Sequence, residues 1–186
     1  MRIVLTGSPA TGKTSVALAL SKLLDCPYVG ANEIAFEIGA ARKVQSGPSA
    51  KDEFTVDLSK LKKALTAIFN KQKTVVAEGH LLCEFALPAD EVVVLRADPR
   101  LLLRRYAKRK YARKKAVANT LVEVLDYCLI ESEENYGRKA RIIQLDVTKK
   151  TGAAEILAKI KAGRSDHVDW SELLLKPPLS KLAQRA

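Results

Sequence analysis

With 186 residues, 47% of them apolar, the chain is long enough for one globular domain with a hydrophobic core, and its composition excludes a disordered protein. Its net charge of +11 favours anionic partners: nucleotides, RNA or both. No apolar run reaches the roughly 18 residues of a membrane span, and the strand-like run from Arg2 leaves no room for a targeting peptide. A protein inside the cell is therefore expected, cytoplasmic in a prokaryote or archaeon, with the nucleus as the alternative in a eukaryote.

The first half of the chain predicts alternating strands and helices, from its apolar periodicity and its Gly and Pro positions. The expected elements are a buried strand at Ile3–Thr6, a helix at about Lys13–Leu24, a short strand at Tyr28–Val29, a helix over residues 31–43, a polar loop over residues 44–56 and an amphipathic helix from about Asp57 to Asn70. Asp57 is the expected N-cap of that last helix.

The second half continues the alternation. The expected elements are strands at Thr74–Glu78, Glu91–Arg96 and Arg141–Leu145, and helices at about 98–108, Lys115–Asn135 and 152–162. Asp98-Pro99 has the pattern of a helix start. This alternation predicts an α/β fold, a five-stranded parallel sheet with helices on both faces. Residues 163–186, with Trp170, are expected to form a docked helix, with a partner-binding segment as the alternative.

A phosphate-binding loop is predicted between the first strand and the first helix. The segment Gly7-Ser8-Pro9-Ala10-Thr11-Gly12-Lys13-Thr14 matches the pattern G-x-x-x-x-G-K-[ST]. Gly7 permits a tight turn, and Gly12 lets backbone N–H groups approach a phosphate. The expected contacts are Lys13 with the β- and γ-phosphates of ATP, Thr14 with Mg²⁺ and Ser15 with the α-phosphate. The motif in this context predicts a P-loop NTPase fold.

A carboxylate and a histidine follow the third expected strand. P-loop enzymes hold Mg²⁺ partly through an acidic residue on a nearby strand. Glu78 ends an apolar strand, at the edge where ligands bind in open α/β sheets, and is expected to hold a Mg²⁺-bound water. His80 is expected to orient a water or a phosphate oxygen. The alternatives are a solvated strand end for Glu78 and an ordinary surface or half-buried histidine for His80.

A strongly basic segment lies between Arg100 and Lys115, with nine Lys or Arg residues, no acidic residue, and Tyr106 and Tyr111 interleaved. One interpretation is a lid whose arginines close over the ATP phosphates, because arginine neutralises the charge of a transferring phosphoryl group. The other is an RNA-binding patch with tyrosines for stacking. Its position after the fourth strand favours the lid, and the two roles are compatible.

The cysteines and histidines give no metal-binding pattern. Cys26, Cys83 and Cys128 are odd in number and lack metal-ligand spacing, so buried reduced thiols are expected. The sequence holds only two histidines, His80 and His167, which excludes a histidine-rich metal site.

Over about residues 2–162 the chain resembles the adenylate kinase isoenzyme 6 family. The P-loop begins the match, and Glu78-Gly79-His80 stands where the family has Asp-x-His. The remaining matches are Val94-Leu95-Arg96-Ala97-Asp98 at the fourth strand, Leu103-Arg104-Arg105 and Arg109-Lys110-Tyr111 at the lid, and Asn119, Glu123, Glu131 and Tyr136 in the following helix.

The resemblance implies a P-loop kinase domain over residues 1–162, with a nucleoside-monophosphate-binding segment at about 30–53 and a lid at about 108–118. It implies transfer of the terminal phosphate of ATP to AMP or a related monophosphate, with Mg²⁺. The implied site comprises Lys13, Glu78, His80 and Arg109 in catalysis, Gly7, Ala10, Gly12, Lys13, Thr14, Ser15, Arg105 and Arg109 in nucleotide binding, and Thr14 and, through water, Glu78 at the metal.

The resemblance also implies ATPase activity and a role in maturation of the small ribosomal subunit. The implied partners are universal small-subunit protein 11 and pre-ribosomal RNA, and no membrane. The alternative function is therefore mainly that of a ribosome-assembly ATPase with little monophosphate kinase activity.

Three residues depart from the family pattern. Ala10 replaces a glycine found in many family loops, which is harmless if its φ is negative. Glu78 replaces an aspartate and is one methylene longer. Phe36 stands near the place of an arginine, which leaves Arg42 and Lys43 as the only cations of the acceptor segment before Lys51. Because an acceptor phosphate with two charges needs cationic partners, weak kinase activity with water as a competing acceptor is expected.

Overall fold

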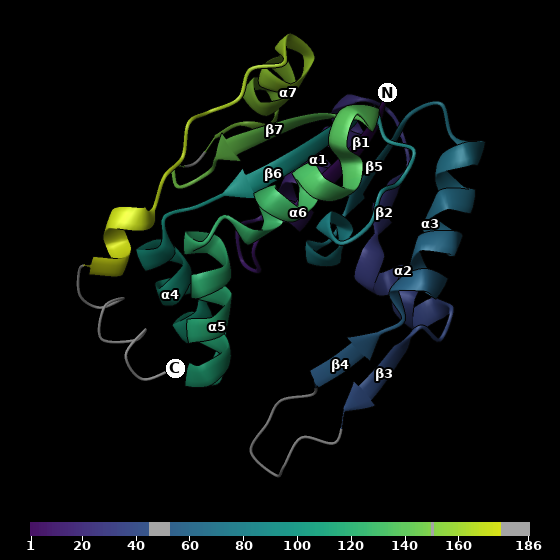
Figure 1. Cartoon of the computed structure of the whole chain (residues 1–186). Coiled ribbons are helices and arrows are strands. Elements are labelled where there is room, and N and C mark those ends of the chain that lie inside the picture. Colours follow the sequence, from purple (N-terminus) through teal and green to yellow (C-terminus); the bar gives the residue numbers. More distant parts are fainter. Residues whose placement is uncertain (45–52, 150, 176–186) are drawn as a thin grey trace.

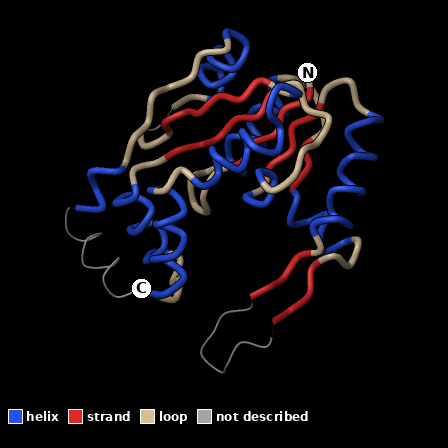
Figure 2. Tube along the Cα trace, viewed as in Figure 1, coloured by secondary structure: helices blue, strands red, loops and turns tan. Residues whose placement is uncertain are grey.

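Five parallel strands form the central sheet of the protein, in the order β2-β5-β1-β6-β7. The computed structural model describes residues 1–44, 53–149 and 151–175. The strands are β1 (Arg2–Thr6), β2 (Tyr28–Gly30), β5 (Val75–Glu78), β6 (Glu91–Arg96) and β7 (Arg141–Asp146). The predicted five-stranded parallel sheet is confirmed, and its interior strands are buried because both faces are covered (Figures 1 and 2).

Each face of the sheet packs against its own set of helices. One core cluster joins β1, β6 and β7 to α1 (Lys13–Leu23), α4 (Pro99–Lys108) and α7 (Ala153–Ala162). The other joins β1, β5 and β6 to α2 (Ala31–Glu37), α3 (Leu58–Lys71) and α6 (Tyr127–Tyr136). The prediction of helices on both faces is confirmed.

The helix starts that the sequence indicated are present. The Asp57 carboxylate accepts a hydrogen bond from the Lys60 N–H at 3.0 Å and caps α3. The Asp98 carboxylate accepts one from the Arg100 N–H at 2.8 Å and caps α4, with Pro99 in the first turn. Both helices therefore begin where their capping residues stand.

The acceptor segment differs from the predicted helix over residues 31–43 and loop over residues 44–56. Helix α2 ends at Glu37, and Gly39 follows with a left-handed φ of 62°. Strands β3 (Ala41–Val44) and β4 (Glu53–Val56) then form an antiparallel pair, with Ala41 opposite Val56. Residues 45–52, part of the predicted loop and acceptor segment, lie outside the described residues.

The predicted single helix over residues 115–135 is two helices. Helix α5 (Arg113–Val124) ends before Asp126, whose φ of 55° breaks the helical path, and α6 begins at Tyr127. The break places the carboxylate of Asp126 against the guanidinium of buried Arg96. A tertiary ion pair thus overrides a continuous helical pattern.

Short 3₁₀ helices and an extended tail complete the described chain. The 3₁₀ helices are His80–Cys83, Gly137–Lys139 and Ser171–Leu175. After α7, Asp166 N–H donates to the Gln144 carbonyl at 2.9 Å, and Gln144 N–H donates to Ser165 Oγ at 3.0 Å. The tail therefore runs along the outer edge of β7. In the described part of the predicted docked helix, the structure has the 3₁₀ turn at Ser171–Leu175. Residues 176–186 lie outside the described part. No helix in the described ranges is long and apolar enough to cross a membrane.

Candidate active site

The P-loop joins the carboxyl end of β1 to the start of α1. Gly7 has a φ of 128°, and a Cβ on it would lie 2.3 Å from the Leu95 carbonyl oxygen of neighbouring β6. Only glycine fits there. Gly12 precedes α1 with a φ of 107° and leaves open space where a side chain would stand. The tight turn expected at Gly7 is present, and the open space at Gly12 leaves room for the predicted approach of backbone N–H groups to a phosphate.

The start of α1 is arranged to receive an anion. No side chain caps this helix end, and its first turn contains no acidic residue. Its free N–H groups and its dipole therefore remain available to a phosphate. The Lys13 amine is buried and donates to the carbonyls of Gly7 at 2.9 Å and Ser8 at 3.0 Å. Burial lowers the pKa of this amine, and a phosphate at the loop would compensate that loss of hydration.

Ala10 does not meet the condition, a negative φ, under which its replacement of glycine is harmless. Its φ is 65°, in the left-handed region that glycine favours. An alanine held there costs about 1 kcal/mol relative to its ordinary conformations. The replacement of the family glycine is therefore a small source of strain in the loop.

Thr14 and Glu78 meet across the loop. Thr14 Oγ1 donates a hydrogen bond to Glu78 Oε1 at 3.0 Å, and the Tyr28 hydroxyl donates to the same oxygen at 3.2 Å. Burial and the nearby Glu78 charge raise the pKa of Tyr28, which keeps it a donor. A hydroxyl and a carboxylate supply the oxygen ligands that Mg²⁺ prefers, so this pair fits the predicted metal position.

His80 lies just beyond Glu78, at the start of the 3₁₀ helix, and its side chain is open to the cavity. The surrounding protein atoms remove part of its hydration and lower its pKa, and the charges of Lys13 and Lys115 lower it further, to about 4. The imidazole is therefore neutral near pH 7, with one donor and one acceptor nitrogen. This state suits the predicted contact with a water or a phosphate oxygen.

Two cavities adjoin the P-loop. The larger, about 700 Å³, is lined by the loop and the predicted metal pair, by the acceptor segment and by α5; these walls include Lys13, Thr14, Phe36, Phe54, Glu78, His80, Lys115 and Asn119. The smaller, about 630 Å³, is lined by residues that include Gly12, Ser15, Arg105, Lys149 and Thr151. Ala10 and Arg109 line both. The loop thus separates two adjoining spaces, each large enough for a small ligand.

The predicted lid region consists of the end of α4, a turn and the first half of α5. These elements extend from one side of the sheet, and strands β3 and β4 extend from the other (Figures 1 and 2). Arg105 Nη1 donates to the Ala10 carbonyl at 2.7 Å, and the Tyr106 hydroxyl donates to the Pro9 carbonyl at 2.8 Å. The Tyr106 ring stacks on that of Tyr111 at 5.3 Å. Part of the basic segment therefore braces the loop. Tyr106 is completely buried, so the prediction that it stacks on RNA is wrong, and RNA stacking stays a prediction only for half-buried Tyr111.

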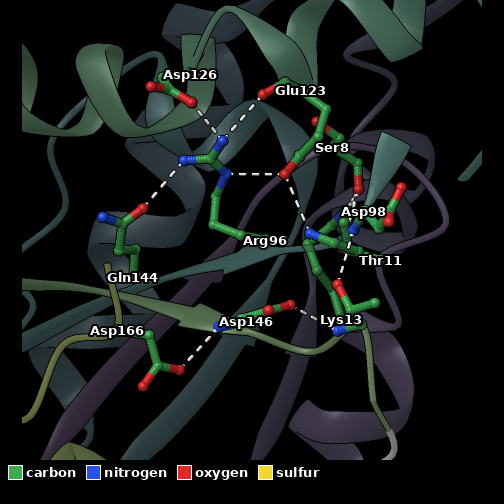
Figure 3. A network of polar contacts seen from close by, with 12 residues as sticks. Ser8, Thr11, Lys13, Arg96, Asp98, Glu123, Asp126, Gln144, Asp146 and Asp166 are labelled. Atoms are coloured by element: carbon green, nitrogen blue, oxygen red, sulfur yellow. Dashed lines mark hydrogen bonds and ion pairs between the residues drawn. The ribbon is translucent and has the colours of Figure 1, made fainter. Parts of the chain in front are cut away.

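Sequence reasoning missed a buried polar network behind the loop (Figure 3). Arg96 donates to Glu123 Oε1 at 2.8 Å, to the Glu123 carbonyl at 3.0 Å, to Gln144 Oε1 at 3.0 Å and to Asp126. The Ala97 N–H donates to Glu123 Oε1 at 3.1 Å. The available signals were an arginine at the end of an apolar strand and a glutamate in the second helix after it, α5. The network attaches α5 to the sheet beside the P-loop.

The cysteines follow the prediction in two of three positions. Cys83 and Cys128 are buried, and Cys26 is half-buried; all three are reduced. Within the described ranges, no cluster of three or more His, Cys, Asp or Glu side chains could hold a metal.

Archaeal proteins are similar to the chain along nearly its whole length. A protein of Thermococcus kodakarensis named "Putative adenylate kinase" is 38% identical over 180 residues, which cover 93% of this chain and 94% of the relative. A protein of the same name from Methanocaldococcus jannaschii is 31% identical over 177 residues, which cover 92% and 94%.

Solved structures share the fold at low sequence identity. The YorR protein of Bacillus subtilis in complex with phosphorylated GDP has a TM-score of 0.56 at 17% identity, over 90% of this chain and all of that one. A gluconokinase from Sinorhizobium meliloti has a TM-score of 0.53 at 17% identity, over 99% and 94%. These likenesses show the fold of P-loop kinases.

The family model described as "AAA domain" matches residues 3–126, which include the P-loop, Glu78, His80 and the basic segment. That match covers more than half of the chain, and the archaeal relatives extend the likeness through β7 and α7. The chain therefore belongs to this AAA-domain family of P-loop proteins, together with the archaeal proteins named as adenylate kinases.

Proposed function

We propose that the protein is a nucleoside monophosphate kinase that transfers the γ-phosphate of Mg-ATP to AMP or a related monophosphate. The observation that carries the proposal is the larger cavity, in which the P-loop and the Thr14–Glu78 pair face the acceptor segment. The names of the archaeal relatives support the same reaction. The finer relationship to the adenylate kinase isoenzyme 6 family is part of this proposal, supported by the motifs at Glu78–His80 and Arg109–Tyr111.

In the proposed reaction, an oxygen of the acceptor phosphate attacks the γ-phosphorus of ATP. The bond between that phosphorus and the β–γ bridging oxygen breaks, and two nucleoside diphosphates form. Lys13 and the α1 N-terminus hold the β- and γ-phosphates, and Arg109, which lines both cavities, offsets charge on the transferred group. Thr14 and, through water, Glu78 would hold Mg²⁺, which would supply further charge neutralisation.

The two cavities suit a donor and an acceptor on opposite sides of the loop. We place the ATP base and ribose in the smaller one, beside Ser15, Arg105 and Lys149, and the monophosphate in the larger one. His80, neutral in the larger cavity, orients a phosphate oxygen or a water there. With water in place of the monophosphate, the same arrangement gives ATPase activity.

A second candidate function is that of an ATPase in small-ribosomal-subunit maturation. The observation that favours it is the cavity wall formed by α2, β3 and β4, whose described lining residues are Asn32, Ala35, Phe36, Ala41, Phe54 and Val56, without a cation. The net charge of +11 suits pre-ribosomal RNA. A pull-down of universal small-subunit protein 11 with and without ATP tests this function, and absence of binding in both conditions contradicts it.

The kinase proposal is tested with radiolabelled AMP and Mg-ATP. We expect labelled ADP to form at a rate that saturates with AMP. Phosphate release from ATP, measured in parallel, separates kinase from ATPase turnover. If phosphate is released at a rate unaffected by AMP and the label stays in AMP, the kinase proposal is wrong and the ATPase alternative is favoured.

A further inference from the structure

One face of α5 leads from the protein interior to the larger cavity. Glu123, Asn119 and Lys115 are spaced four residues apart and so lie on the same face of the helix, about 6 Å apart along its axis. Glu123 is 2% exposed and is held by Arg96 and the Ala97 N–H (Figure 3). Asn119 and Lys115, one and two turns nearer the N-terminus of α5, line the cavity.

Asn119 presents a buried donor without an acceptor. Its Nδ2 atom is shielded from solvent and has no hydrogen-bond partner among the described residues. Buried polar groups in folded proteins are nearly always paired, and an unpaired one is costly to keep. A side chain that lines a ligand cavity and keeps an unpaired N–H is therefore expected to find its acceptor on the ligand.

The charges around the cavity indicate which part of the ligand this is. The described residues of the acceptor segment that line the cavity contribute no cation, whereas Lys13, Arg109 and Lys115 line it from the P-loop and the α4–α5 side. In the proposed reaction Lys13 binds the phosphates of ATP. Arg109 also lines the smaller cavity, in which we place the ATP base and ribose. Lys115, whose Nζ lies 5.8 Å from the centre of the Tyr111 ring, is the cation adjacent to Asn119 along the helix.

We propose that Asn119, with Lys115, binds the phosphate of the acceptor monophosphate. On acceptor binding, Asn119 turns its Nδ2–H from this shielded position into the cavity and donates it to a phosphate oxygen, and Lys115 supplies positive charge from one turn away. This inference rests on the kinase function proposed above and names the acceptor-phosphate site. In this site, donors on α5 take the place of the cations that are missing near Phe36. The anchoring of Glu123 fixes α5 so that the two donors stay at the cavity.

The test measures acceptor binding and turnover separately. AMP affinity is determined by calorimetry in the presence of a non-hydrolysable ATP analogue, and KM values for AMP and ATP are determined from ADP formation. The variants are Asn119→Ala, Asn119→Asp and Lys115→Gln. Lys114→Gln is the matched control, because Lys114 is the exposed neighbour that does not line the cavity.

We expect Asn119→Ala to weaken AMP binding about 10-fold, and Asn119→Asp to weaken it more because a carboxylate repels the phosphate. Lys115→Gln should act in the same direction, KM for ATP should change less than about 2-fold, and Lys114→Gln should resemble the wild type. The melting temperature of Asn119→Ala should equal or exceed that of the wild type, because an unpaired buried donor is removed. A purely structural asparagine would instead lower it.

Equal AMP affinity and equal KM for AMP in wild type and both Asn119 variants would overturn the proposal, as would an effect confined to ATP. Its failure is distinguishable from failure of the kinase function. If labelled AMP is phosphorylated but the variants bind AMP normally, only the Asn119 assignment is wrong. If no AMP is phosphorylated but the variants still weaken AMP binding, the assignment holds and the kinase function is wrong.

Discussion

The guanidinium of Arg96 and the carboxylate of Glu123 meet at 2.8 Å in the protein interior, where both side chains are almost completely buried. The pair joins the end of β6 to α5, and β6 also contacts the P-loop through Leu95 and Gly7. A buried ion pair of this kind contributes most clearly when one partner is removed, because the other is left as an uncompensated charge. The position of α5 over the cavity therefore depends on this contact.

Replacement of Glu123 tests that dependence. We expect Glu123→Gln to lower the free energy of unfolding by about 3 kcal/mol, because the Arg96 charge loses its closest buried partner. Chemical denaturation measures the change. Glu134→Gln, an exposed site on α6, serves as control and should change stability by less than about 0.5 kcal/mol. Equal stability of both variants would show that Asp126 and Gln144 suffice to hold Arg96.

Ala10→Gly should relieve the strain in the P-loop. Glycine removes the cost of a φ of 65° but adds flexibility to the unfolded chain, so a net gain of about 0.5 kcal/mol is expected. The same exchange at Ala118, an exposed helical position in α5, should cost about 1 kcal/mol. Thermal melting should give shifts of opposite sign for the two variants, and a destabilised Ala10→Gly variant would contradict strain at Ala10.

Lys13→Ala should abolish phosphoryl transfer, because no other residue supplies a charge at the β- and γ-phosphates from within the loop. Lys22→Ala, which removes an exposed charge from the other end of α1, should leave turnover unchanged. ADP formation and phosphate release are the measurements. Wild-type turnover in the Lys13 variant would contradict the central role of the P-loop.

Glu78→Gln should raise the Mg²⁺ concentration needed for half-maximal turnover by about 10-fold or more, because an amide replaces the carboxylate that faces Thr14. Tyr28→Phe removes only a hydrogen bond to the same oxygen, so a smaller shift is expected. Titration of activity with MgCl₂ compares them. A Glu78 variant with the wild-type Mg²⁺ requirement would remove this residue from the metal site.

His80→Ala should lower kcat more than it weakens ATP binding, since the neutral imidazole lies in the larger cavity beyond Glu78. The comparison requires kcat together with a dissociation constant for an ATP analogue. A loss confined to ATP affinity would mean that His80 contributes to donor binding only.

Local sequence signals predicted the parts of the molecule that depend on neighbouring residues. The P-loop pattern, the cap at Asp57 and the Asp98-Pro99 start are each contained within a few positions, and each is present in the structure. The alternation of apolar strands with helices likewise predicted the parallel sheet, because burial on both faces requires continuous apolar strands.

Features that depend on distant contacts were not predictable in the same way. The β3–β4 pair is stabilised by the pairing of its two strands, and Phe36 and Phe54 make an edge-to-face contact with ring centroids 4.8 Å apart. Because these contacts are not visible in the local sequence, the short basic strand β3 was predicted as the end of a helix. The α5–α6 break depends on Arg96, thirty residues earlier than Asp126. The unpaired amide of Asn119 becomes visible only when the cavity around it is known.

The tail along β7 has a consequence for solubility. An outermost strand with open N–H and C=O groups can recruit a strand from another molecule and start aggregation. Here Ser165 and Asp166 occupy the outward N–H groups of Gln144 and Asp146, and Asp166 N–H occupies the Gln144 carbonyl. Lys159 holds Asp166 in place at 2.9 Å. The segment after α7 thereby occupies, in the second half of β7, hydrogen-bonding groups that an added strand would need.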